Sequence, residues 1–464
     1  MAVTEAGSAE MDASEAGSSE MGASEAGSSE MGASEAGSSE MGASPGDPAL
    51  TGSVGVPVAA PGGAAGTGVC APLGFRAGTA GAGIRDGDPS RDDIAVVMSD
   101  RPCAGAGVFT QNLVKAAPVV ISQLTLRRGT AIHAVVLNSG NANACTGAQG
   151  LRDALRMCAL AAGALGRDPV EVLVCSTGVI GRPLPMERVA DGLRAAAGSL
   201  SGDSGAAAAR AIMTTDTVPK VATAQFTVDG VEHRVGGMAK GAGMIHPNMA
   251  TLLALVTTDA DVAAPDLQAL LVEVAETSFN SITVDGDTST NDTLFALANG
   301  AAGGPALRPG DAGFLALREA FLGVCESLAE QVVADAEGAT KHFRVTVAGG
   351  RDDAEARLAA RTVAVSPLVK TAVHGADPNW GRVVMALGRS GARFSLDRVR
   401  VTIAGTTVFE HGAPIDTDLS AVVAALQQPR SEIDIDLGAG DGHGHAWGCD
   451  LTAGYVRINA EYTT

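Results

Sequence analysis

The chain has 464 residues, of which 46% are hydrophobic and only 3% aromatic. This length allows either about three domains or one large sandwich, with a core built mainly from Ala, Val, Leu and Ile. The formal net charge of −20 argues against a nucleic-acid-binding surface. Residues 1–48 contain ten Asp and Glu and no Lys or Arg, so half of the negative excess belongs to that segment.

The seven cysteines show no C-x-x-C spacing, which predicts reduced, mostly buried thiols and neither a disulfide framework nor a zinc knuckle. The first residues lack a basic region followed by an apolar core, and no run of about 18 apolar residues occurs. We therefore expect a cytoplasmic protein that has neither a membrane nor a nucleic acid as its partner.

Residues 5–44 consist of four copies of an acidic ten-residue unit that is rich in Ser and Gly. This composition offers too little apolar surface to offset the entropy lost on ordering, so we predict disorder here. A Pro- and Gly-rich linker then leads to residue 67. An arm that binds a partner or improves solubility is the functional alternative.

Alternating strands and helices are predicted in the next part of the chain. The strand at 171–175 ends in Ser176, Thr177 and Gly178. Such a turn can present N–H groups to an oxyanion, although an ordinary strand-to-helix turn with a capping hydroxyl is the simpler interpretation. The other predicted elements are strands at 94–98, 106–110 and 131–137, helices at 146–165, 185–198 and 203–213, and a hairpin around Asp229-Gly230 that leads to Lys240.

The stretch from Lys240 to Asp259 is the candidate centre of the chemistry. It contains a Gly-rich turn, a Pro-Asn turn and an apolar run, in which Thr251 would ordinarily be a β-branched residue of a buried strand. A functional role follows if Thr251 Oγ attacks the Ala250 carbonyl and water cleaves the resulting ester. Thr251 would then carry an α-amine, with an ordinary pKa of about 7.7–8.0, as a base beside its own hydroxyl.

Lysine is scarce in this chain, since only five lysines stand against 27 arginines. A composition that places Arg on the surface leaves Lys where a compact ammonium is needed. This favours a specific role for Lys240.

The second half of the chain offers two possible metal sites, and we prefer a structural interpretation of both. Asp285, Asp287 and Asp292 lie in a turn-rich loop that lacks the closing Glu of a Ca²⁺ site. The stretch 442–449 has two histidines but reads as a flexible Gly-rich turn. We also predict helices at 264–278, 311–336 and 352–361, a strand at 343–347, a packed turn at 377–382, and a C-terminal strand followed by a polar end.

Many long motifs, in one order from about Gly68 to Thr464, resemble the ornithine acetyltransferases of arginine biosynthesis. The family is also known as bifunctional glutamate N-acetyltransferase/amino-acid acetyltransferase. Besides the stretch at 240–259, the motifs are G-V-C-A-P-L-G-F-R-A (68–77), L-N-S-G-N-A-N-A-C-T-G (137–147), S-T-G-V-I-G (176–181), T-T-D-T-V-P-K (214–220), S-P-L-V-K-T-A-V-H-G-A-D-P-N-W-G-R (366–382) and R-I-N-A-E-Y-T-T at the C-terminus.

The resemblance implies an α/β fold, an α-β-β-α sandwich that cleaves itself between Ala250 and Thr251. The fragments 68–250 and 251–464 would fold together and assemble as α₂β₂, with no cofactor. It also implies acetyl transfer from N²-acetyl-L-ornithine to L-glutamate through acetyl-Thr251. Thr177 and Gly178 would form the oxyanion hole, and the substrate-binding residues would be Thr217, Lys240, Thr251, Glu337, Asn459 and Thr464.

Several alternatives stay open from the sequence. Acetyl-CoA is a possible second acetyl donor, and the chain could serve a secondary-metabolite cluster instead of primary arginine synthesis. An N-terminal-nucleophile aminopeptidase or amidase would use water as the acyl acceptor. A non-catalytic scaffold with the repeat arm as a tether is the remaining alternative.

Overall fold

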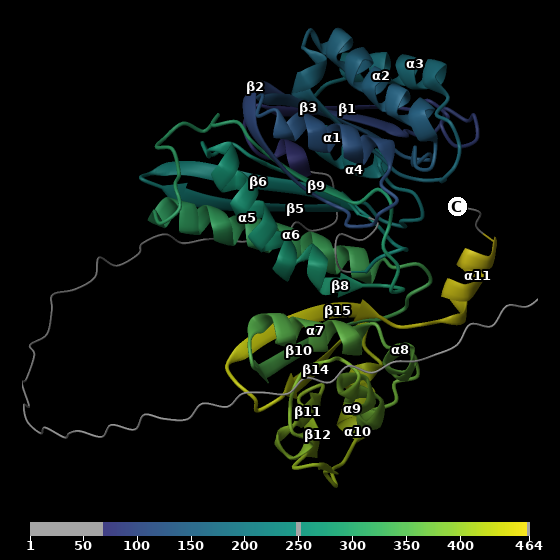
Figure 1. Cartoon of the computed structure of the whole chain (residues 1–464), viewed down its shortest axis with the longest axis vertical. Helices are drawn as coiled ribbons and strands as arrows, with labels where there is room; N and C mark the ends of the chain where they lie inside the picture. The colour runs from purple at the N-terminus through teal and green to yellow at the C-terminus, as the bar shows by residue number, and fades with distance from the viewer. Residues whose placement is uncertain (1–67, 247–251, 462–464) are drawn as a thin grey trace, which may run out of the picture. The chain divides into compact units, whose positions relative to one another are not determined.

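The computed structural model describes residues 68–246 and 252–461 (Figure 1). They belong to one structural unit, residues 50–464. The acidic repeat and linker predicted at residues 1–67 lie outside the described residues. Among the described helices, none combines the length and the apolar character that crossing a membrane requires.

The larger sheet contains eight strands in the order β4-β3-β2-β9-β7-β6-β5, with β1 paired to β2. The predicted hairpin is confirmed, because β5 and β6 pair in antiparallel fashion around Asp229 and Gly230, which both have positive φ. The strands are β1 (Phe75–Ala80), β2 (Ile94–Phe109), β3 (Ile132–Asn138), β4 (Val172–Ser176), β5 (Lys220–Val228), β6 (Val231–Lys240), β7 (Leu253–Thr258) and β9 (Thr293–Ala298).

Strand β2 runs through both segments that were predicted as separate strands, 94–98 and 106–110, so the predicted break between them was wrong. Its first half pairs with β1 and β3, and its second half pairs with β9. Residues 100–102, which are polar or proline, are exposed and coincide with a register shift against β3. A register shift of this kind can accommodate Pro102, which has no N–H to donate, without ending the strand.

The two halves of this sheet pack against each other. One buried cluster combines Val135 and Leu137 of β3 with Leu253 and Leu255 of β7. The alternate residues of these strands face the other way, into clusters beneath helices. Strands that are buried on both faces read as continuous apolar runs, which is why they were predictable.

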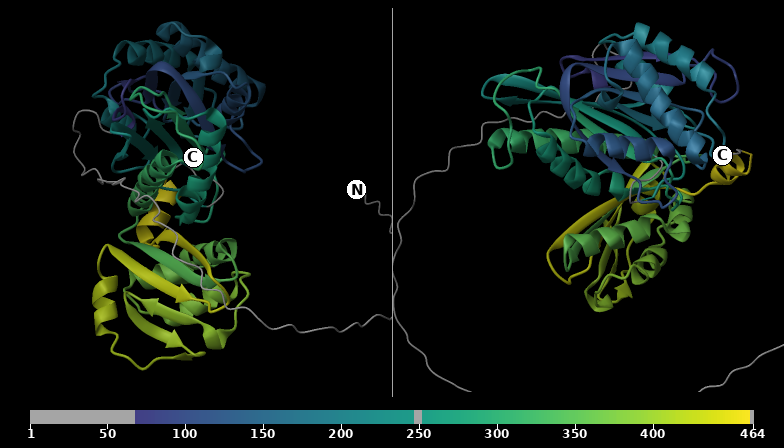
Figure 2. Two further views of the ribbon diagram at one scale, coloured as in Figure 1. Left: turned by 90° about the vertical axis from the view of Figure 1, so that its left-hand side faces the viewer. Right: turned by 45° about the horizontal axis from the view of Figure 1, so that its top comes forward.

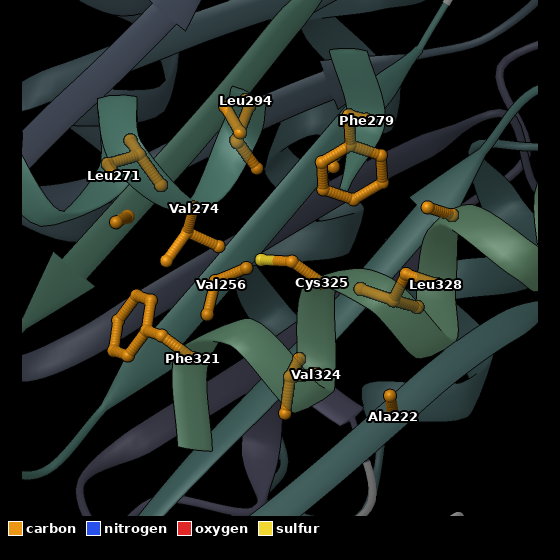
Figure 3. Close-up of a cluster of buried hydrophobic side chains, with 14 of the residues drawn as sticks. Ala222, Val256, Leu271, Val274, Phe279, Leu294, Phe321, Val324, Cys325 and Leu328 are labelled. Atoms are coloured by element: carbon orange, nitrogen blue, oxygen red, sulfur yellow. The ribbon is translucent and has the colours of Figure 1, made fainter. Parts of the chain in front are cut away.

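Helices cover both outer faces and complete the predicted α-β-β-α sandwich. Figure 1 shows α1 (Ala117–Arg127), α2 (Gly147–Leu165) and α3 (Met186–Gly198) over the first half of the sheet. Helices α5 (Ala264–Thr277) and α6 (Ala312–Ala334) cover the second half, where Figure 3 shows their side chains against Val256 and Leu294. The short α4 (Gly205–Ala211) adds alanines to the inner cluster.

A second sheet of seven strands has the order β13-β12-β11-β14-β10-β15-β8, and Figure 2 shows it with its helices from two sides. Its strands are β8 (Ile282–Thr283), β10 (His342–Gly350), β11 (Arg400–Ile403), β12 (Thr406–Glu410), β13 (Ala413–Pro414), β14 (Arg430–Asp436) and β15 (Gly442–Cys449). Its helices are α7 (Asp353–Ala364), α8 (Pro367–His374), α9 (Trp380–Gly388) and α10 (Ser420–Leu426). Short 3₁₀ helices occur at Gly68–Cys70, Pro169–Glu171, Phe279–Ser281 and Leu396–Arg398.

The flexible turn predicted at 442–449 was wrong, because these residues form β15. This strand pairs with β10 in antiparallel fashion and with β8 in parallel fashion. Its glycines serve close packing: a Cβ atom on Gly444 would lie 2.4 Å from the backbone nitrogen of Arg357 in α7. Glycine in a strand often marks such an approach of another backbone.

The predicted C-terminal strand was also wrong, because Ala453–Glu461 form the helix α11. The Thr452 hydroxyl accepts hydrogen bonds from the N–H groups of Gly454 and Tyr455, as a helix N-cap does. None of the residues of α11 is buried. The sequence therefore carries no core-facing pattern that could have distinguished helix from strand.

The packed turn predicted at 377–382 is the junction between α8 and α9. The Asn379 side chain accepts a hydrogen bond from Arg382 N–H and caps α9. The Arg382 guanidinium in turn donates to Leu368 O in α8. Trp380 stacks on Phe409 with ring centroids 5.2 Å apart.

We predict that Phe321→Ala, which empties part of the cluster in Figure 3, lowers the free energy of unfolding by about 3–5 kcal/mol. Leu315→Ala on the same helix is the matched control. Its side chain is 48% exposed, and its change should stay within about 0.5 kcal/mol. Equilibrium urea unfolding of both variants measures the difference, and equal midpoints would contradict this packing.

Candidate active site

A cavity lies where the chain leaves β3, β4 and β6. Loop residues 289–291, the segment after α6 and helix α11 complete its wall. Its lining contains Ala142, Thr177, Gly178, Ile180, Thr214, Thr215, Lys240, Gly243, Met244, Ser289, Thr290, Asn291, Glu337 and Asn459. Residues from distant parts of the sequence therefore meet in one place.

Five of the predicted site residues line this cavity: Thr177, Gly178, Lys240, Glu337 and Asn459. Thr217 does not line it, since Thr217 is exposed and bonded to Asp335 through both its N–H and its hydroxyl. Thr214 and Thr215 of the same motif face the cavity instead. The predicted Ala250, Thr251 and Thr464 lie outside the described residues.

From the turn we had expected Thr177 to present its backbone N–H to the cavity. The structure differs, because only the hydroxyl of Thr177 is available there. Its N–H donates to Asn138 O at 2.9 Å, which continues the pairing of β3 with β4. Its Oγ1 accepts a hydrogen bond from Lys240 Nζ at 3.2 Å, so the hydroxyl proton stays available as a donor.

Gly178 presents the second donor. Among the hydrogen bonds of the described backbone, none starts from the Gly178 N–H. Its φ is +129°, and a Cβ atom there would lie 2.3 Å from the Gly140 carbonyl carbon. Only glycine fits this position, because any side chain would both strain the backbone and collide with it.

Asn291 holds this turn in place, a role that the sequence analysis missed. Its buried amide donates to Ser176 O at 2.8 Å and to Ala142 O at 2.6 Å. One side chain thus joins the segments that follow β3 and β4. The hydroxyl of Thr290 donates to the Asn291 Oδ1, which fixes the orientation of the amide.

Lys240 is a buried cation at the end of β6, with only 2% of its surface exposed. Burial lowers the pKa of its ammonium group, and the nearby Asp216 carboxylate opposes that effect most strongly. A desolvated ammonium that faces a cavity is suited to bind a carboxylate.

Glu337 adds a carboxylate to the lining of the same cavity. Its Oε2 accepts a hydrogen bond from Asn459 Nδ2 at 2.9 Å, and its N–H donates to Ala242 O at 2.8 Å. These contacts tie the end of α6, the start of the 241–246 loop and helix α11 together. The carboxylate is half-buried and can accept hydrogen bonds from an ammonium group.

The Asp-rich loop holds both sides of the segment 247–251. The Asp285 carboxylate accepts hydrogen bonds from the N–H groups of Met244 and Ile245 at 2.6 and 2.9 Å. Asp292 Oδ1 accepts a hydrogen bond from the N–H of Leu252 at 3.0 Å. Burial raises the pKa of Asp292 well above its ordinary value. Within the described ranges no cluster of three or more His, Cys, Asp or Glu could hold a metal ion.

Comparisons with known proteins agree over nearly the whole described chain. A model of the ArgJ family matches residues 76–464. The arginine biosynthesis bifunctional protein ArgJ of Symbiobacterium thermophilum is 52% identical over 397 residues, which are 86% of this chain and 98% of that protein. The protein of the same name from Dehalococcoides mccartyi is 46% identical over 85% of this chain and 97% of its own length.

A solved structure is also similar in sequence. The ornithine acetyltransferase of Mycobacterium tuberculosis, crystallised with ornithine, is 43% identical where it aligns. The alignment covers 40% of this chain and 97% of the crystallised chain, with a TM-score of 0.36.

We predict that Asn291→Asp lowers the free energy of unfolding by about 2–5 kcal/mol, because the change leaves two buried carbonyl oxygens without their donor. Asn112→Asp is the control, since Asn112 is only half-buried and donates to a single carbonyl oxygen, Thr288 O. Urea unfolding compares the two variants. An equal loss in both would show that Asn291 does not anchor the turn.

Proposed function

The chain belongs to the ArgJ family, and on that premise we propose that it transfers the acetyl group of N²-acetyl-L-ornithine to L-glutamate. The products are L-ornithine and N-acetyl-L-glutamate, so the protein is an acyltransferase of arginine biosynthesis. One observation carries the proposal: a single cavity joins two hydrogen-bond donors, a buried cation and a carboxylate. These are the groups that an acyl transfer between amino acids requires.

Thr251 is the proposed nucleophile. It precedes Leu252 in the sequence, and Leu252 N–H is held by Asp292 one residue before the start of β7. Leu253 is the strand partner of Lys240, so the residues that directly follow Thr251 in the sequence are anchored beside this lysine. Cleavage between Ala250 and Thr251 frees the α-amine, which then serves as the base for the hydroxyl.

The reaction proceeds in two halves. Thr251 Oγ attacks the acetyl carbonyl of acetylornithine, the C–N bond breaks, and ornithine leaves with the proton that the α-amine carries. Glutamate then attacks acetyl-Thr251 through its α-amine and regenerates the free hydroxyl. In both halves the Thr177 hydroxyl and the Gly178 N–H stabilise the oxyanion, which in other enzymes makes each donor worth about 10²–10³-fold in rate.

The remaining residues bind the amino-acid parts of the substrates. Lys240 binds a carboxylate, and Glu337 with Asn459 receives an ammonium. Thr217 and Thr464 complete the predicted set. For Thr217 this requires a substrate to reach it, or its segment to move, because its side chain is bonded to Asp335.

The fragments 68–250 and 251–464 remain together after cleavage. Contacts between them support this, such as Asn291 with Ser176 and Asp285 with Met244. We further propose an α₂β₂ assembly in the cytoplasm, and acetyl-CoA as a second, slower acetyl donor.

Isotope exchange tests this function. We expect the purified protein to move a labelled acetyl group from acetylornithine to glutamate, and the Thr251→Ala variant to lose at least about 10³-fold of that activity. The chain without residues 1–65 should exchange as fast as the full chain. Release of labelled acetate to water without a glutamate product would identify an aminopeptidase or amidase instead, and no turnover of either kind would favour a scaffold.

A further inference from the structure

Asp216 lies beside the two buried lysines of the site, in the segment before β5, and its side chain is fully buried. Its Oδ1 accepts hydrogen bonds from Lys220 Nζ at 2.7 Å and from Gly241 N–H at 2.7 Å. Its Oδ2 accepts the N–H of Thr214 at 3.0 Å. The carboxylate therefore fixes the backbone directly after Lys240 and also fixes a residue of the cavity wall.

Lys220 holds Asp216 from the other side. Its side chain is completely buried, and its ammonium also donates to Asp335 Oδ2 at 2.6 Å. Asp335 follows α6 and is only 7% exposed. A buried ammonium with two carboxylate partners has a fixed position, because leaving any of these charges unpaired in the interior is costly.

Four titratable groups face Lys240 from the elements around it: Asp216, Lys220, Asp292 and Glu337. Burial raises the pKa of Asp292 well above its ordinary value, and its Oδ1 accepts a hydrogen bond from the N–H of Leu252. Glu337 also lines the cavity, and its carboxylate accepts a hydrogen bond from the Asn459 amide. Asp216 is the carboxylate that the contacts fix beside Lys240, because it binds both the Lys220 ammonium and the N–H of Gly241, the residue after Lys240.

Asp216 itself stays ionised. Burial alone would raise the pKa of its carboxyl, but the positive charges of Lys240 and Lys220 outweigh burial and lower that pKa to about 2. With Asp335, the two lysines and two carboxylates balance. Removing one charge from this cluster must therefore shift the pKa values of the remaining groups.

We propose that Asp216 is a positioning residue for the acetyl transfer: it keeps Lys240 positively charged and aimed at the substrate carboxylate, and Lys220 holds Asp216 in place. The identity of that carboxylate rests on the proposed function. The charge balance between Asp216, Lys220 and Lys240 is independent of the proposed function.

The direction of the effect follows from the signs of the charges. Burial favours the neutral form of Lys240 and Asp216 favours the charged form, so Asp216→Asn makes Lys240 lose its proton at a lower pH than in the wild type. Lys220 disfavours the charge on Lys240, so Lys220→Met makes Lys240 lose its proton at a higher pH. A variant with both changes removes one charge of each sign. The pH at which its Lys240 loses the proton should therefore lie between the values of the two single variants.

Lysine NMR measures this titration directly. The chain has only five lysines, so protein labelled with ¹³C at lysine Cε gives five resonances, and the one absent from Lys240→Met belongs to Lys240. We expect its midpoint to move to lower pH in Asp216→Asn and to higher pH in Lys220→Met. A midpoint that is unchanged in the folded variants, or two shifts in the same direction, would overturn the inference. Either single variant decides the question if the other does not fold.

Kinetics separate this inference from the proposed function. In Asp216→Asn we expect the KM for acetylornithine at pH 8 to rise at least about tenfold and to recover at lower pH, while kcat changes less. A purely structural loss would lower kcat at every pH and leave the pH profile in place, which contradicts a positioning role. If the wild type fails to exchange acetyl groups while the Lys240 midpoint shifts as expected, the proposed function is wrong and the charge balance stands.

Discussion

The burial of two ammonium groups is the constraint on which this site depends. Lys220 and Lys240 are almost without solvent contact, and an isolated charge in such a place would lose its proton or unfold the protein. Asp216 and Asp335 provide the compensation, from the segment before β5 and from the end of α6. The sandwich must bring these segments together before the cavity can have a cation in its wall.

The four-layer architecture explains how it does so. Strands β3 and β4 end at the same edge, where Thr177 and Gly178 follow β4, and β6 ends there with Lys240. The loop 285–292 then fastens the parts: Asn291 holds the turn after β4, while Asp285 and Asp292 hold the residues on either side of 247–251. The proposed cleavage between Ala250 and Thr251 would require such anchors, because it removes the peptide bond that joins the two fragments.

Most of the sandwich was predictable from the sequence because its strands are buried on both faces and carry unbroken apolar runs. The continuity of β2, strand β15 and helix α11 were not predictable. They depend on an irregular pairing at residues 100–102, on the close packing of Gly444 against α7, and on the lack of buried residues in α11.

For the site, the motifs predicted which residues line the cavity better than they predicted the contacts that those residues make. The Gly-rich turn and the rarity of lysine pointed to Lys240, and the structure places it in the cavity wall. The same motif that suggested Thr217 instead brings Thr214 and Thr215 to the cavity, because Asp335 binds Thr217. Asp216 and Asn291 act through partners that are distant in sequence, Gly241 and Ser176, and no local pattern reveals such pairs.

The central claim is that acetyl transfer passes through Thr251 as a new N-terminus, and the mass of the purified protein after incubation with acetylornithine tests it most directly. The account predicts two fragments separated between Ala250 and Thr251, with one acetyl group on Thr251 of the second fragment, removed again by glutamate. A single uncleaved chain, or an acetyl group that resides on another residue, would contradict it.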